Sequence, residues 1–122
     1  MTKKRVLLVE DEPLIQMSVI EYLVDAGYDV IAAQQGFEAM AILENRASDL
    51  DVLLTDLGFV SGPDGWQVAQ RGRELNPLLA VIYMSGEGRN LLRTHGVEGG
   101  IMLQKPFTEG QLLSALTSLA RL

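Results

Sequence analysis

The sequence predicts an α/β fold, a doubly wound five-stranded parallel sheet between helices in a three-layer αβα sandwich. Five short apolar runs lie at 6–9, 30–33, 52–54, 79–84 and 101–103. They lack polar/apolar alternation, which is typical of strands covered on both faces. Longer amphipathic stretches separate the runs, so strands and helices alternate. This order favours parallel strands joined by right-handed crossovers.

The stretches between the runs carry apolar residues at helical spacing and recognisable ends. Gly27 is typical of a helix stop, while Asp64 with Gln67 and Thr108 with Gln111 form possible amino-terminal caps. The apolar positions of the five expected helices are Leu14, Ile15, Val19, Tyr22, Leu23 and Ala26; Phe37, Met40, Leu43 and Ala47; Trp66, Val68 and Ala69; Leu91 and Leu92; and Leu112, Leu113, Leu116, Leu119 and Ala120.

Length and composition exclude several classes of protein. The 122 residues predict a single domain over 1–122, and a hydrophobic content of 48% is enough for a core. With no cysteine and one histidine, disulfides and a thiolate or histidine-rich zinc site are excluded. The net charge of −6 argues against direct nucleic-acid binding. No signal peptide or membrane-spanning run is recognisable, so we expect a cytoplasmic domain without membrane insertion.

Polar residues follow four of the five predicted strands. Strand one leads into Glu10, Asp11 and Glu12, strand three ends on Asp56, and strands four and five lead into the two remaining groups, Ser85 and Lys105. Because ligands of doubly wound sheets bind beyond the carboxyl ends of the strands, we expect these side chains to meet at one edge.

The acidic members of this group predict a magnesium site. Glu10, Asp11 and Asp56 offer only carboxylate oxygens, which suit a hard divalent cation, and Mg²⁺ is the expected ion. Register favours Glu10 over Glu12 as the second acid of the pair, with contact through a water molecule. Gly58 allows the backbone to bend so that its carbonyl faces the metal.

The same group contains what phosphoryl transfer requires. A metal ion and Lys105 would neutralise the phosphoryl oxygens while the Asp56 carboxylate attacks in line and forms an acyl phosphate. The Ser85 hydroxyl could then bind a phosphoryl oxygen, a contact that exists only after modification. Ser85 is therefore a candidate switch residue.

Four motifs resemble those of the response-regulator receiver domains of two-component signalling: VEDEP at 9–13, LLTD at 53–56, YMSG at 83–86 and QKPF at 104–107. The resemblance covers essentially the whole chain and implies a flavodoxin-like (βα)5 fold. It implies Asp56 as phosphoacceptor, Glu10 and Asp11 as the acidic pair, Ser85 as the switch hydroxyl, Lys105 as the site lysine, and a cis Lys105–Pro106 bond. The segments 95–97 and 103–108 are similar to receivers attached to hybrid histidine kinases.

The chain departs from the family pattern at the switch. Three residues before Lys105 the family usually has an aromatic side chain that rotates inward, and this chain has Met102. The aromatic residue nearest to Ser85 in sequence is Tyr83, which lies on the same face of the strand as Ser85. The loop after Asp56 is one residue longer than the common pattern, and the segment 86–100 is short, which predicts a stunted fourth helix.

The site residues are compatible with three functions. The first is a phosphoacceptor domain, which is not a conventional enzyme. Its expected partners are a histidine kinase or histidine phosphotransfer protein and a downstream protein, and a homodimer is a further option. The second is a phosphatase of the haloacid dehalogenase type. That chemistry typically requires a second aspartate as acid/base two residues after the nucleophile, where this chain has Gly58. The third is a receiver-fold interaction module that does not use phosphorylation. A nucleotide or flavin site finds no support, because no glycine-rich phosphate loop follows strand one.

Overall fold

The sheet has five parallel strands, as predicted. The structure, a computed structural model, describes residues 3–59, 62–86 and 92–119. All strand pairs are parallel, in the order β2-β1-β3-β4-β5. The strands are β1 (Arg5–Val9), β2 (Asp29–Ala33), β3 (Val52–Asp56), β4 (Ala80–Ser85) and β5 (Ile101–Gln104). Each contains most or all of one of the predicted apolar runs.

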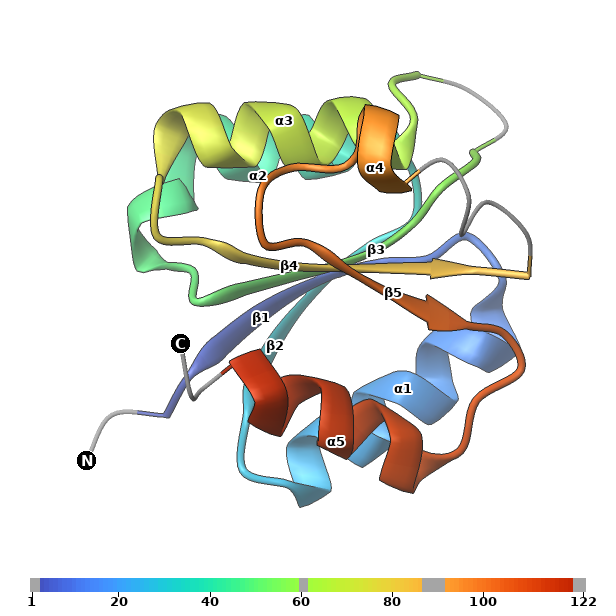
Figure 1. The fold of residues 1–122 in the computed structure, drawn as a ribbon. Coiled ribbons are helices and arrows are strands. Elements are labelled where there is room, and N and C mark those ends of the chain that lie inside the picture. Colours follow the sequence, from blue (N-terminus) through green and yellow to red (C-terminus); the bar gives the residue numbers. More distant parts are fainter. Residues whose placement is uncertain (1–2, 60–61, 87–91, 120–122) are drawn as a thin grey trace.

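Helices cover both faces of the sheet, which confirms the three-layer sandwich. Helices α1 and α5 lie on one face, and α2 and α3 on the other, with α4 on the side of α3 (Figure 1). Their bounds are α1 (Pro13–Asp25), α2 (Gly36–Arg46), α3 (Gly65–Leu75), α4 (Leu92–His95) and α5 (Glu109–Leu119), and a 3-10 turn, η1 (Ala47–Asp49), follows α2. No helix in these described ranges is long and apolar enough to cross a bilayer.

Both predicted capping boxes are present. The Asp64 carboxylate accepts a hydrogen bond from the Gln67 amide at 2.9 Å, and the Gln67 side chain accepts one from the Asp64 amide. Thr108 and Gln111 make the same reciprocal pair at the start of α5. Each box satisfies two backbone donors that a helix start would otherwise leave without partners.

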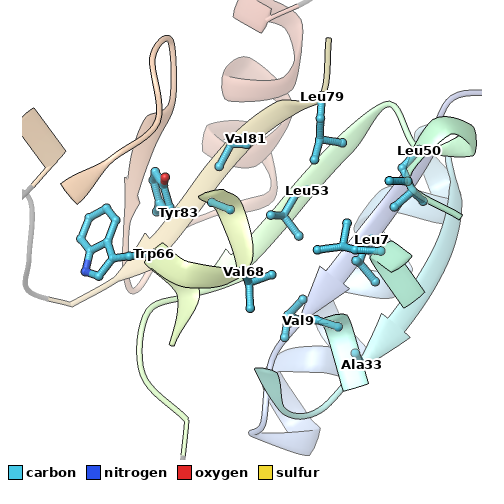
Figure 2. Packing of buried hydrophobic residues seen from close by; sticks show 14 residues of the cluster. Leu7, Val9, Ala33, Leu50, Leu53, Trp66, Val68, Leu79, Val81 and Tyr83 are labelled. Atoms are coloured by element: carbon cyan, nitrogen blue, oxygen red, sulfur yellow. The ribbon is translucent and has the colours of Figure 1, made fainter. Parts of the chain in front are cut away.

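Strand pleating divides the core in two. The α2/α3-side core contains Leu7, Leu53 and Tyr83, and Figure 2 shows part of it. The α1/α5-side core contains neighbours from the same strands, such as Leu8 and Leu54. Because successive residues of a strand point to opposite faces, the continuous apolar runs supply both cores at once.

Three of the apolar helix positions expected to face the core are exposed instead. Leu14 is 79% exposed and Phe37 is 55% exposed, and Ala26, which directly follows α1, is exposed as well. The buried line of α1 runs through Val19 and Leu23, and Leu14 lies about 100° around the helix from Ile15, the partly buried residue at its start. In α2 the fully buried side chains are Ala39 and Leu43, so Phe37 lies off that line. The expectations for Leu91 and Ala120 fall outside the described residues.

Gly65 allows the start of α3 to pack against the end of β3. A Cβ atom at this position would overlap the carbonyl oxygen of Asp56, whereas a Cβ at the exposed Gly58 would meet nothing within 4 Å. We expect Gly65→Ala to lower the free energy of unfolding by about 1–3 kcal/mol, because the backbone must shift to relieve the overlap. Urea denaturation should show this loss, with Gly58→Ala close to wild type. Equal stability of the two variants would contradict this account of the packing.

Candidate functional site

Four strands deliver polar side chains to one edge of the sheet. Glu10 directly follows β1, Asp56 ends β3, Ser85 ends β4 and Lys105 directly follows β5. The strand registers align these ends, since Asp56 pairs with Met84 and Ser85 with Gln104. The edge is therefore the one predicted, at the carboxyl ends of the strands.

Lys105 joins two of the acids. Its Nζ lies 2.7 Å from Glu10 Oε1 and 3.2 Å from Asp56 Oδ2. The backbone amide of Lys105 donates to the Ser85 carbonyl at 2.8 Å, which holds the start of the β5–α5 loop against the end of β4. The lysine thus connects residues that are 95 and 49 positions away in sequence.

Glu10 is the most enclosed acid of the group. Its exposed fraction is 0%, and its Oε2 accepts a hydrogen bond from the Glu12 amide at 3.1 Å. Burial raises the pKa of Glu10 above its usual value, although the hydrogen bonds from Lys105 and from the Glu12 amide act in the opposite direction. A cation near this carboxylate would favour its charged form.

Asp56 is partly accessible to solvent. Its side chain is 17% exposed, with Oδ2 facing Lys105 and Oδ1 accepting a hydrogen bond from the Leu57 amide at 2.8 Å. The two contacts hold the carboxylate in one orientation at the rim of the core. A charged group at such a place requires partners of this kind, because an unpaired buried carboxylate is costly.

Burial would lower the pKa of Lys105, but its hydrogen bond to Glu10 and the negative charge of Asp56 outweigh that effect. The pKa of Lys105 is consequently raised. The side chain therefore stays charged at neutral pH. A fixed positive charge at the rim of a cluster of acids can bind an incoming anion.

Asp11 completes a group of three carboxylates. Glu10, Asp11 and Asp56 each offer an oxygen, and these oxygens lie within 4.8 Å of one another. Two ligands on opposite sides of Mg²⁺ are about 4.2 Å apart, because each Mg–O distance is about 2.1 Å. With one contact made through water, the three carboxylates fit this ion in both chemistry and spacing. Glu12, the alternative weighed from sequence, is exposed and precedes α1.

Ser85 and Gly58 lie beside this cluster in the chain. Ser85 is partly buried and is the last residue of β4, one position beyond the partner of Asp56. Gly58 is exposed and lies in the loop two residues after Asp56. Their roles as switch hydroxyl and as metal-facing carbonyl remain proposals. The Lys105–Pro106 bond is cis, as the resemblance implied.

Sequence reasoning missed two supporting residues. Gln16 donates from Nε2 to the carbonyls of Glu10 and Ala33, at 3.1 and 3.2 Å, and so ties α1 to the ends of β1 and β2. Gly65 packs against the backbone of Asp56. Nothing local distinguishes Gln16 from a solvated helix residue, whereas Gly65 follows a recognisable helix cap.

Met102 stands where the family usually has its aromatic switch residue. Met102 is partly buried in the α2/α3-side core and pairs in register with Tyr83 on β4. Tyr83 is fully buried, and Trp66 is 8% exposed. In the described part of the chain, the fourth helix comprises Leu92–His95, and residues 87–91 before it lie outside the described residues.

Most of this chain is similar in sequence to known proteins. The family model described as "Response regulator receiver domain" matches residues 6–117. The chain belongs to the response regulator receiver family. As a receiver domain it is a signalling module and not a conventional enzyme, and the family implies a histidine kinase as a partner.

Relatives of this receiver occur in different protein contexts. It is 30% identical over 119 residues to the "Transcriptional regulatory protein TcrA" of Mycobacterium tuberculosis, covering 96% of this chain and 46% of that protein. It is 30% identical over 114 residues to the "Sensor kinase CckA" of Brucella abortus, covering 91% of this chain and 12% of the kinase. The chain therefore spans about half or less of the length of these curated relatives.

Solved receiver structures superpose closely. A response regulator receiver protein from Sinorhizobium medicae is 36% identical, with a TM-score of 0.92 and coverage of 98% of this chain and 95% of that chain. The receiver domain of the hybrid histidine kinase CckA is 28% identical, with a TM-score of 0.81 and coverage of 94% and 97%. The predicted fold and family are thereby confirmed.

Magnesium is expected to stabilise this receiver. At a free concentration about a hundredfold above Kd, binding to the folded state alone contributes about 2.7 kcal/mol. The melting temperature should rise with Mg²⁺ and fall again with a chelator. Asp11→Asn should abolish the rise, whereas Glu12→Gln, which changes a neighbouring exposed acid, should retain it. A rise of wild-type size in Asp11→Asn would place the ion elsewhere.

Proposed function

We propose that this receiver takes a phosphoryl group from a phosphohistidine donor onto Asp56, and that the modification changes its surface for a protein partner. The observation that carries the proposal is the contact of Lys105 Nζ with both Glu10 and Asp56, next to the Asp11 carboxylate. An accessible carboxylate beside a fixed positive charge and a cluster of acids is suited to acceptance of a dianionic phosphoryl group.

Asp56 is the acid best placed to attack. Glu10 is fully buried and cannot be reached by a donor, whereas the Asp56 side chain is 17% exposed. Its Oδ1 is held by the Leu57 amide, which fixes the plane of the carboxylate for in-line attack. Lys105 Nζ, now paired with Oδ2, would turn to a phosphoryl oxygen as the charge of the carboxylate is consumed.

The bonds exchanged are one P–N bond for one P–O bond. An oxygen of the Asp56 carboxylate attacks phosphorus, and the electron pair of the broken P–N bond returns to the imidazole of the donor, which takes up a proton from solvent. Bound Mg²⁺, held by Asp11, Asp56, the Gly58 carbonyl and, through water, Glu10, would supply charge neutralisation at the phosphoryl oxygens. Slow attack of water on the acyl phosphate returns the free carboxylate.

Ser85 would report the modification. Its position at the end of β4, beside the end of β3, allows its hydroxyl to donate to a phosphoryl oxygen on Asp56. Such a contact exists only in the phosphorylated state and can therefore bias a two-state element. We place the receiver in the cytoplasm, where a histidine kinase or histidine phosphotransfer protein is the phosphoryl donor. The partner that binds the phosphorylated form is a further protein or a second copy of the chain.

The test is the intact mass after incubation with acetyl phosphate and Mg²⁺. We expect one added phosphoryl group on wild type and on Asp25→Asn, which removes an exposed carboxylate of α1. We expect none on Asp56→Asn or on wild type with a chelator. Failure of wild type to gain mass, together with no spectral response to beryllofluoride, would contradict phosphoacceptance.

Met102 favours one alternative. Because it replaces the aromatic side chain that the resemblance implies, the domain could act as an interaction module without phosphorylation. The same mass measurement separates the two functions. A phosphatase activity is disfavoured by Gly58, which supplies no acid two residues after Asp56, and steady turnover of p-nitrophenyl phosphate would be needed to support it.

A further inference from the structure

An aromatic cluster of Trp66, Tyr83 and His95 lies on the α2/α3 side of the sheet. The ring centroids of Trp66 and Tyr83 are 4.5 Å apart at an angle of 51°, and those of Trp66 and His95 are 5.7 Å apart at 44°. Figure 2 shows Trp66 and Tyr83 side by side. The cluster joins the start of α3, the middle of β4 and the end of α4.

Trp66 is connected to the backbone of Asp56 through its neighbour. The Gly65 amide donates to the Leu57 carbonyl at 2.7 Å, and Gly65 packs so closely on the Asp56 carbonyl that a Cβ would overlap it. Trp66 is the next residue. Because packed backbone segments of this kind shift together, a change in the backbone at Asp56 and Leu57 would move the indole ring.

Tyr83 is connected to Ser85 through β4. The two residues are on the same face of the strand, two positions apart, so a turn of the strand end at Ser85 changes the orientation of Tyr83. The Tyr83 hydroxyl accepts a hydrogen bond from the Val97 amide at 3.0 Å, in the connection between α4 and β5. Gly100 lies against the same ring, since a Cβ there would be 3.0 Å from Tyr83 Cε2.

The neighbouring side chain is poorly suited to carry a movement. Met102 pairs in register with Tyr83 and packs in the same core, but an unbranched thioether adapts to its surroundings by rotating its own bonds. Tyr83 is rigid, fully buried and fixed at both its ring and its hydroxyl. Any displacement of this side chain must therefore break the bond to Val97 or move the backbone that makes it.

We propose that Tyr83 and Trp66 form the relay that carries modification of the acceptor site to the connection at 95–100, with the Tyr83 hydroxyl–Val97 amide bond as the element that changes. The inference rests on the proposed phosphorylation of Asp56. In the unmodified state the bond holds the connection against β4. When Ser85 binds the phosphoryl group, the end of β4 turns, Tyr83 is displaced, and Val97 and His95 move with it.

The chain offers a direct reporter, because Trp66 is its single tryptophan. The experiment records Trp66 emission and the ¹H–¹⁵N resonance of Val97 before and after addition of beryllofluoride with Mg²⁺. The variants are Tyr83→Phe, which removes only the hydroxyl, and two controls. Tyr28→Phe makes the same change in the opposite core, and Met102→Leu changes the neighbouring position. Phosphoryl uptake from acetyl phosphate is measured separately by intact mass.

In wild type and both controls, we expect both signals to change. In Tyr83→Phe we expect normal phosphoryl uptake but a largely lost response at Val97. A full response at Val97 in Tyr83→Phe, or an unchanged Val97 resonance in a wild type that takes up phosphoryl, would overturn the relay. Absence of phosphoryl uptake by wild type would instead show that the underlying function is wrong, and the mass measurement distinguishes this case.

Discussion

Replacing Lys105 by glutamine is expected to slow phosphoryl transfer to Asp56 by about 100-fold, the usual cost of removing one preorganised donor from a developing anion. Lys105 Nζ contacts Asp56 Oδ2 at 3.2 Å, and it would turn to a phosphoryl oxygen as the charge of that carboxylate is consumed. The rate of mass gain with acetyl phosphate measures the effect. A wild-type rate in Lys105→Gln would exclude the lysine from the transfer step.

The same variant should bind magnesium no more weakly than wild type. Lys105 repels a cation and occupies oxygens of Glu10 and Asp56 that the ion would use, so its removal favours the metal. Titration with Mg²⁺, followed by Trp66 fluorescence, separates this effect from a general loss of the site. Lys4→Gln is the matched control, because Lys4 is exposed and precedes β1, so we expect it to leave both measurements unchanged.

Replacing Leu53 by alanine is expected to lower the free energy of unfolding by about 2–5 kcal/mol, because a fully buried leucine leaves a cavity when it is truncated. Leu53 is 0% exposed and lies three residues before Asp56 in β3. Strand β3 lies between β1 and β4 in the sheet. A domain of ordinary stability has about 5–15 kcal/mol in total, so this single change removes a large part of it.

Urea denaturation measures this loss, with Leu78→Ala as control. Leu78 is 92% exposed, and substitutions of exposed residues are usually within about 0.5 kcal/mol of wild type. Comparable losses in the two variants would contradict the assignment of Leu53 to the core. A wild-type level of phosphorylation in folded Leu53→Ala would show that the acceptor site tolerates the cavity beneath it.

The grouping of the site residues at one edge could be predicted from the sequence because of a property of parallel sheets. Strand ends meet at one edge, so Asp11, Asp56, Ser85 and Lys105 could be grouped without any knowledge of distances. The helix caps at Asp64 and Thr108 were equally readable, since each depends only on residues within one turn. Gln16 could not be found this way, because its partners at Glu10 and Ala33 lie across the start of the sheet.

The sequence by itself determined the alternation of strands and helices and the edge at which the polar residues gather, because periodicity and strand-end position are local properties of the chain. The family came from the resemblance of four short motifs to those of receiver domains. Only the tertiary structure decided that Glu10 is enclosed against Lys105, that Leu14 and Phe37 face solvent, and that Tyr83 meets Trp66 and Val97. Burial and contact depend on how segments far apart in sequence pack together, and a local sequence pattern does not specify which segments meet.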